Sequence, residues 1–517
     1  MKRKIIAVSK HRYRSTRLHS QAFFIHLTHT INIIRSKLSC LRFINYLCVS
    51  FQNTAQMNNC EDLTQGKITA TLLQFTLPMI AGAMMQQCYN IADTLIVGRL
   101  IGPEALAAVG SAYTLMVFIT SIILGLSMGS GTVFSLKFGN GDLPALRRSV
   151  FASLILTGAV TLALNVAAYL WTDDILRLLS VPGDVYPLMR CYLIIIFSGI
   201  ILSFVYNFCA SLLRSVGNSR APLWFLAVSV VLNVLLDLVF ILLLHQGVEG
   251  AATATVVSQA VAAAGIVTYI IKTHPELLPK AADTTINKDT IREIVTFSSL
   301  TCVQQSVMNF GILMVQGLVN SFGMAVMAAF AAAVKIDSFA YMPVQEFGNA
   351  FSTFIAQNFG ASKAGRIRRG MRRALVMTIL FSIAVSAIVF ILAEPLMTIF
   401  VDPGQKEIIA IGADYLRIEG AFYAGIGILF LLYGYYRAIR MPAMSVVLTV
   451  LSLGLRVLLA YLLAAVPSIG VNGIWWSIPI GWFVADSVGM LYYGHTLRKI
   501  YTPRGIQLHK MMTGHRA

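Results

Sequence analysis

Long apolar stretches dominate this chain and leave little choice of fold. Each exceeds the roughly 20 apolar residues that a helix needs to cross a bilayer, and inside a bilayer the backbone must satisfy its own hydrogen bonds, which favours helices. The chain is 57% hydrophobic but only 12% charged, whereas soluble domains average about 25% charged. We therefore predict an all-α polytopic membrane protein with twelve spans, over residues 70–99, 105–136, 146–171, 186–213, 221–244, 248–271, 291–320, 325–357, 370–393, 408–436, 442–465 and 471–496.

Basic residues at the start of the chain account for much of its net charge of +18. Residues 1–56 hold ten Lys and Arg and no acid, and they lack the compact apolar region and cleavage site of a signal peptide. We expect them to be a disordered or non-native extension ahead of a start at Met57, or alternatively a basic anchor on anionic lipid. A nucleic-acid-binding domain would need a soluble fold to present its charge, so no nucleic-acid partner is expected.

The placement of the remaining basic residues predicts the topology. Loops on one side of the membrane hold 22 Lys and Arg, and those on the other side hold three, Arg99, Arg177 and Lys406. Positive charge marks the cytoplasmic side, so both termini are expected there. The predicted parts are the extension 1–56, an N-lobe 57–271, a cytoplasmic linker 272–290, a C-lobe 291–496 and a cytoplasmic tail 497–517.

The two lobes repeat each other in sequence. KFGNGDLPALRRSV at 137–150 aligns with NFGASKAGRIRRGM at 358–371, and GVEGAA at 247–252 aligns with GVNGIW at 470–475. Six crossings return the chain to its starting side, so the lobes have the same orientation. We predict two pseudo-symmetric six-helix bundles around a central cavity, the arrangement of carriers that alternate access by rocking.

Polar residues inside the spans of the N-lobe form the main candidate site. Asp93 is a lone carboxylate in its span, and such a group costs roughly 2.5–3.5 kcal/mol to insert. Asn233 and Asp237 are four residues apart and share one helix face, and Thr255 lies in the next span. Oxygen ligands of this kind suit a hard cation or a shared proton. The alternatives are that Asp93 reaches the headgroups from near its helix end, or that these residues form a packing network without an ion.

The chain resembles the multidrug and toxic compound extrusion (MATE) family from about Gly66 to Arg498. The residues that carry the resemblance are LPMIAGAMMQQCYNIADTLIVGRLIGPEALAAVG at 77–110 and MPVQEFGNAFSTFIAQNFGASKAGRIRRGM at 342–371. It implies two six-helix bundles in a V and export of organic, often cationic compounds against inward H⁺ or Na⁺. In the DinF-like branch, the family's cation-binding positions fall on Asp93, Asn233, Asp237 and Thr255 of this chain.

The C-lobe carries a different set of polar residues. Lys335 is expected to neutralise Asp337 or Glu346 as a structural pair, and Arg456 stands where the repeat places Asp237. The NorM-like branch of the family uses a glutamate where this chain has Gln304 or Gln305, so cation coupling is expected in the N-lobe. Further cavity-lining candidates from both lobes are Gln86, Tyr89, Gln259, Gln304, Lys335 and Asp337. Pro78, Pro343 and Pro479 are expected to bend their spans, or to free carbonyls that neighbouring groups must satisfy.

The sequence thus predicts a multi-pass exporter in the cell membrane that works as a monomer on small organic substrates. No GxxxxGK[ST] motif is present, so ATP is not expected to drive it, and no cofactor or metal is expected beyond the coupling ion, H⁺ or Na⁺. A flippase for a lipid-linked saccharide is the alternative, because Arg417, Arg456 and Lys335 could make a cationic cavity. A membrane enzyme or receptor would need a larger outer domain than these short loops provide.

Overall fold

The computed structural model describes residues 62–178, 181–283 and 287–500. The predictions for residues 1–56 and for most of the tail at 497–517 lie outside this part of the chain. In the first half, the helices that the structure describes are α3 (Ile68–Leu100), α4 (Pro103–Gly139), α5 (Leu143–Leu170), α6 (Thr172–Leu178), α7 (Tyr186–Ser198), α8 (Ile200–Ser215), α9 (Arg220–Leu238) and α10 (Val248–Thr273). In the second half they are α11 (Lys288–Asn320), α12 (Met324–Gly360), α13 (Ala364–Ile391), α14 (Ala393–Met397), α15 (Lys406–Gly420), α16 (Tyr423–Ala438), α17 (Pro442–Ala464) and α18 (Val471–Ile500).

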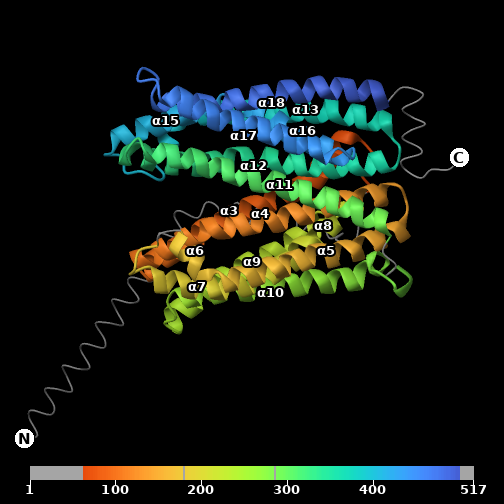
Figure 1. Ribbon diagram of the computed structural model, residues 1–517, viewed down its shortest axis with the longest axis horizontal. Helices are drawn as coiled ribbons and strands as arrows, with labels where there is room; N and C mark the ends of the chain where they lie inside the picture. The colour runs from red at the N-terminus through yellow and green to blue at the C-terminus, as the bar shows by residue number, and fades with distance from the viewer. Residues whose placement is uncertain (1–61, 179–180, 284–286, 501–517) are drawn as a thin grey trace, which may run out of the picture. The chain divides into compact units, whose positions relative to one another are not determined.

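The described helices confirm an all-helical, multi-pass membrane protein (Figure 1). Ten are long and apolar enough to cross a bilayer alone, and two bent pairs, α7 with α8 and α15 with α16, bring the number to twelve if each pair is one span. The pairs bend by 42° and 51°. They occupy the fourth and tenth predicted spans, so the repeat in sequence is matched by a repeat in helix shape.

The bend between α7 and α8 falls at Gly199 and is supported from two neighbouring helices. Asn165 of α5 donates a hydrogen bond from its amide to the carbonyl of Phe197 at 2.5 Å, which satisfies an acceptor at the break. A Cβ at Gly199 would lie 2.5 Å from Oε1 of Gln259. The three prolines expected to bend their spans lie inside α3, α12 and α18, and bends at these positions stay predictions.

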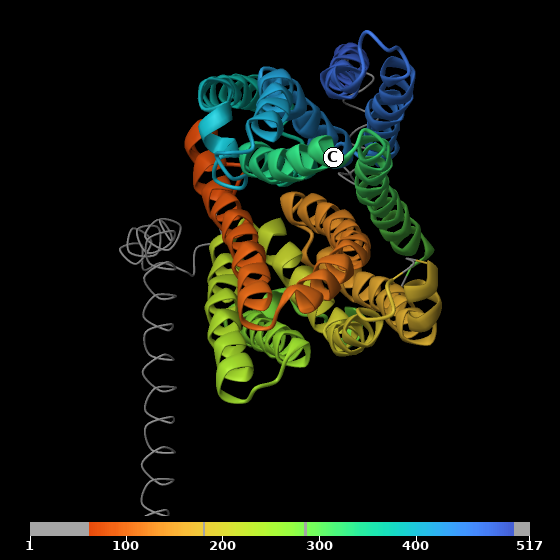
Figure 2. The same ribbon diagram turned by 90° about the vertical axis from the view of Figure 1, so that its left-hand side faces the viewer.

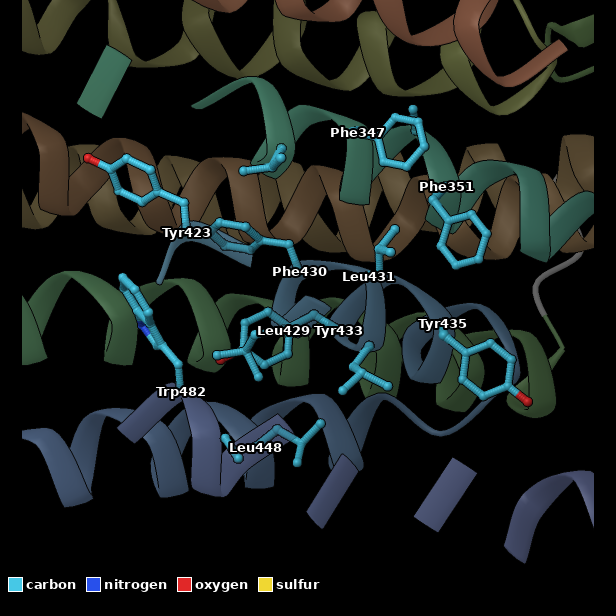
Figure 3. Packing of buried hydrophobic residues seen from close by; sticks show 14 of the residues in the cluster. Phe347, Phe351, Tyr423, Leu429, Phe430, Leu431, Tyr433, Tyr435, Leu448 and Trp482 are labelled. Atoms are coloured by element: carbon cyan, nitrogen blue, oxygen red, sulfur yellow. The ribbon is translucent and has the colours of Figure 1, made fainter. Parts of the chain in front are cut away.

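Buried side chains form two apolar clusters, and α3 contributes to both. One cluster is built from the first half, with Val97 of α3 among its members. The other is built mainly from α11 to α18, and Leu72 and Phe75 from the start of α3 belong to it. Figure 3 shows part of this second cluster, where Phe347 and Phe351 of α12 lie near Phe430 and Leu431 of α16. Helix α3 therefore ties the two halves together.

The two halves approach most closely along α4, which lies against α11 and α12 (Figures 1 and 2). Gly129 faces α11 so tightly that a Cβ there would lie 2.5 Å from the carbonyl oxygen of Phe297. Ser130 and Ser298 are hydrogen-bonded at 3.0 Å beside this contact. Small residues permit such close helix contacts in membranes. These contacts lie toward the side of the membrane on which α3 and α11 begin. We name this side of the protein the inner end.

A short segment at residues 62–66, which we name the strap, closes the inner end further. Its Leu63 backbone donates to Oε1 of Gln357 at 3.2 Å, and the Gln357 amide donates to the carbonyl of Ser215 in the other half at 2.7 Å. The Lys363 ammonium donates to the carbonyl of Thr64 at 2.9 Å. The Arg366 guanidinium donates to strap carbonyls, including that of Gly66 at 2.6 Å. The strap and both halves thus share one hydrogen-bond network.

Candidate functional site

Three helices of the first half bring the candidate site residues together. Asp93 lies on α3, Asn233 and Asp237 lie on α9, and Thr255 lies on α10, and α9 packs against both other helices. Asp93 is 9% exposed and Asp237 is fully buried. Both carboxylates are therefore enclosed by the protein. The alternative in which Asp93 extends to the lipid headgroups does not agree with this burial.

Hydrogen bonds join the members of this site. The Asn233 amide is oriented by its partners: it donates to Oδ2 of Asp237 at 3.0 Å and accepts from the backbone amide of Thr255 at 3.0 Å. The hydroxyls of Thr255 and Tyr89 lie 3.2 Å apart. Tyr89, which the sequence predicts as a cavity residue, joins the site through this contact. The i, i+4 spacing of Asn233 and Asp237 thus gives a direct contact on one helix face.

The charges of the two carboxylates act on each other. Asp93 and Asp237 lie within electrostatic reach, and Tyr192 of α7 lies within reach of both. Oδ1 of Asp93 and Oδ1 of Asp237 are buried without a hydrogen-bond partner. Two buried like charges without a compensating cation are strongly unfavourable, so the pair favours uptake of a proton or a small cation. Carboxylate, amide and hydroxyl oxygens are the ligands that such a cation prefers.

The remaining cavity candidates differ in their exposure and in their neighbours. Gln86 is exposed, Gln304 is buried, and Gln259 lies against the bend at Gly199. Lys335 is exposed, and its ammonium lies 6.0 Å from the ring centre of Phe400. Among the described residues, no hydrogen bond or ion pair joins these four to Asp93 or Asp237, and their place in a cavity stays a prediction.

Asp337 belongs to a second buried cluster, in the C-lobe, that the sequence did not predict. Its charge interacts with Glu419 of α15 and Arg456 of α17, and all three side chains are buried. Oδ1 of Asp337, Oε2 of Glu419 and Nε of Arg456 lack a hydrogen-bond partner. The expected pairing of Asp337 with Lys335 is wrong, because Arg456 is the basic group that Asp337 faces. The alignment of Arg456 with Asp237 was the one signal in the sequence for this cluster.

A third polar cluster joins the halves toward the inner end. Glu346 of α12 interacts with Arg214 of α8 and Arg437 of α16, so its partners also differ from the expected Lys335. The Asn349 amide donates to the Glu346 carboxylate at 3.2 Å, and Arg437 donates to the Ser352 hydroxyl at 3.3 Å. Two guanidinium groups face one carboxylate here, so this junction has an excess of positive charge.

Comparison with known proteins places the chain in a family. Residues 78–239 and 301–462 both match the MatE family, one match in each half. The chain is 29% identical over 434 residues to the probable multidrug resistance protein YpnP of Bacillus subtilis, covering 84% of this chain and 96% of that protein. It is 26% identical over 441 residues to the FAD transporter of Shewanella oneidensis, covering 82% and 94%.

Solved structures give the same assignment of the fold. A MATE structure in complex with MaL6 superposes with a TM-score of 0.80 at 23% identity, covering 84% of this chain and 98% of the other. An outward-facing multidrug resistance MATE transporter superposes with a TM-score of 0.80 at 22% identity, covering 85% and 98%. With two family matches that span more than half of the chain, this protein belongs to the MatE family of multidrug and toxic compound extrusion transporters, and it is a membrane transporter and not an enzyme.

Proposed function

We propose that this protein is a secondary-active exporter of small organic compounds, driven by H⁺ or Na⁺ that binds between Asp93 and Asp237. The observation that carries the proposal is the pair of buried carboxylate oxygens without partners in the first half, next to the amide of Asn233 and the hydroxyl of Thr255. The arrangement of these residues on α3, α9 and α10 supports placement in the DinF-like branch. Relatives named for multidrug resistance in Bacillus subtilis and multidrug export in Staphylococcus aureus support the substrate class.

The mechanism follows from the charge of the site and the position of α3. A bound cation or proton removes the repulsion between Asp93 and Asp237, so it favours a tighter packing of α3 on α9. Since α3 also packs on α12, this change reaches the interface between the halves. A ligand shifts a conformational equilibrium only by its differential affinity for the two states, so substrate and cation must favour different packings of α3. We place both termini in the cytoplasm, with the inner end facing it.

The alternative function, a flippase, receives less support from the side chains that suggested it. Arg417 is ion-paired with Glu394 at 2.9 Å, Arg456 faces Asp337 and Glu419, and Lys335 is exposed. Acids therefore offset the charge of Arg417 and Arg456, which leaves less positive charge for a cationic cavity. The positively charged junction of Arg214, Arg437 and Glu346, together with a relative named as an FAD transporter, makes an anionic organic compound a useful second substrate in the test.

The test is transport in vesicles with a pH gradient and a sodium gradient imposed separately. We expect Asp237→Asn to reduce efflux of a fluorescent organic cation to the rate seen without a gradient, while the protein still inserts. Asp174→Asn removes an exposed carboxylate and serves as the control with full transport. Full gradient-driven efflux by Asp237→Asn would contradict the proposal, and so would loss of coupling in Glu419→Gln alone. Transport of a flavin dinucleotide in the same vesicles tests the anionic substrate.

A further inference from the structure

Four arginines occupy one side of α13 where it leaves the inner end. Arg368, Arg369, Arg372 and Arg373 are exposed, and we name them the arginine face. Their spacing of i, i+1, i+4 and i+5 places them on one side of a helix. The opposite side is buried through Ile367, Gly370, Met371 and Ala374. A Cβ at Gly370 would lie 2.5 Å from the ring of Phe354, so α13 is fixed in its rotation and the arginines must point away from the bundle.

The same side of α13 becomes apolar one turn further on and stays exposed. Val376, Leu380 and Ile383 are 49%, 64% and 56% exposed. At 100° per residue, their mean direction differs from that of the four arginines by only roughly 20°. In a membrane-spanning helix, an exposed apolar strip lies against lipid tails. The guanidinium groups therefore stand at the headgroup level of the leaflet whose tails cover Val376 and Leu380.

The arginine face has no acid to neutralise it among the residues that the structure describes. The ion pairs of this part of the chain include none of the four arginines. The repeat offers a direct contrast, because Arg147 of the first half, which aligns with Arg368, is bound to Asp283 at 2.6 Å. Arg366, in the same turn of α13, also has partners within the protein, because it donates hydrogen bonds to carbonyls of the strap. Arg369 also donates to the carbonyl of Gly365 at 3.2 Å, and none of the four arginines is paired with a described acid.

We propose that the arginine face binds the phosphate groups of anionic phospholipids in the leaflet at the inner end. Guanidinium groups match phosphate oxygens with paired hydrogen bonds. The continuity of the face with a lipid-covered apolar strip argues for a lipid as the occupant, because headgroups of that leaflet are already within reach. A soluble anion would have to compete with them. This inference does not depend on the coupling site proposed above.

The experiment measures the selectivity of the full-length protein for anionic lipid. The protein is placed in nanodiscs of phosphatidylcholine with an increasing fraction of phosphatidylglycerol, and the association of a spin-labelled phosphatidylglycerol is recorded. One basic residue near an anionic surface contributes about 1 kcal/mol, or about fivefold in binding. We expect the variant R368Q/R369Q/R372Q/R373Q to lose at least about tenfold of the selectivity. The variant with four lysines keeps the charge but not the paired hydrogen bonds, so it should keep only part of the selectivity. Added salt should weaken the association.

Two further variants keep the test decisive. The pairs R368Q/R369Q and R372Q/R373Q remove less charge from the cytoplasmic side and are less disturbing to insertion, and each should lose part of the selectivity. The control R177Q/K406Q removes two exposed charges from the other membrane side and should change nothing. Unchanged selectivity in the fourfold variant and in both pairs, or an equal loss in the control, would overturn the proposal. Displacement of the lipid by inorganic phosphate beyond the effect of chloride at equal ionic strength would identify a soluble anion instead.

Discussion

The substitution Gly129→Ala tests whether the contact of α4 with α11 sets the conformation of this transporter. The added Cβ would lie 2.5 Å from the carbonyl oxygen of Phe297 and 2.5 Å from the Cα of Ser298, about 0.9 Å short of the 3.4 Å at which ordinary contact begins. Both opposing atoms belong to the backbone, so no side chain can turn aside. Overpacking of this kind costs about 1–3 kcal/mol.

This cost falls on the state in which the inner end is closed. A state in which α4 and α11 are separated at Gly129 does not have this overpacking cost. The equilibrium constant between the two states therefore shifts toward the separated state by about 5-fold to 150-fold, because 1.4 kcal/mol corresponds to about tenfold. Spin labels at Lys272 and Gly365, one in each half at the inner end, report the change as a longer distance by double electron–electron resonance. The population with the longer distance should rise in Gly129→Ala.

A matched control separates this effect from helix propensity. Gly110 lies on the same helix, and a Cβ there has nothing within 4 Å. Gly110→Ala therefore brings the same gain of about 1 kcal/mol in helix propensity without the clash, and its distance distribution should match that of the wild type. Identical distributions for Gly129→Ala and Gly110→Ala, in protein that is inserted and monodisperse, would refute the reasoning.

Two further predictions concern other parts of the chain. Asn165→Ala leaves the buried carbonyl of Phe197 without its donor and should lower the free energy of unfolding by about 1–3 kcal/mol, measured by thermal unfolding in detergent; an unchanged midpoint would contradict this. In the linker, burial would raise the pKa of Asp283, but the hydrogen bond and charge of Arg147 hold this pKa below the usual 3.8. Because the pKa is lower in the folded state, the stabilisation is present above about pH 4 and is lost as the pH falls further. A spin label at exposed Lys280 should stay immobile from pH 8 to pH 5 and gain mobility only below pH 5. Mobility above pH 5 would show that the Arg147–Asp283 pair does not hold the linker in place.

The local pattern of the sequence predicts the membrane spans and one contact within the candidate site. The number of spans follows from apolar length, because the bilayer sets how many residues a helix needs. The contact of Asn233 with Asp237 follows from their spacing on one helix. The orientation of the termini and the use of the site by an ion stay predictions, since no contact within the protein reports on either.

The choice of partners between helices was decided only by the tertiary structure. Lys335 and Asp337 are neighbours in sequence, yet the rotation of α12 turns Asp337 into the bundle toward Arg456 and leaves Lys335 exposed. The bend at Gly199 and the strap likewise depend on side chains from distant segments. Hydrophobicity determines that a helix spans the membrane, whereas the packing of its neighbours determines which side faces inward, and therefore which buried charges meet.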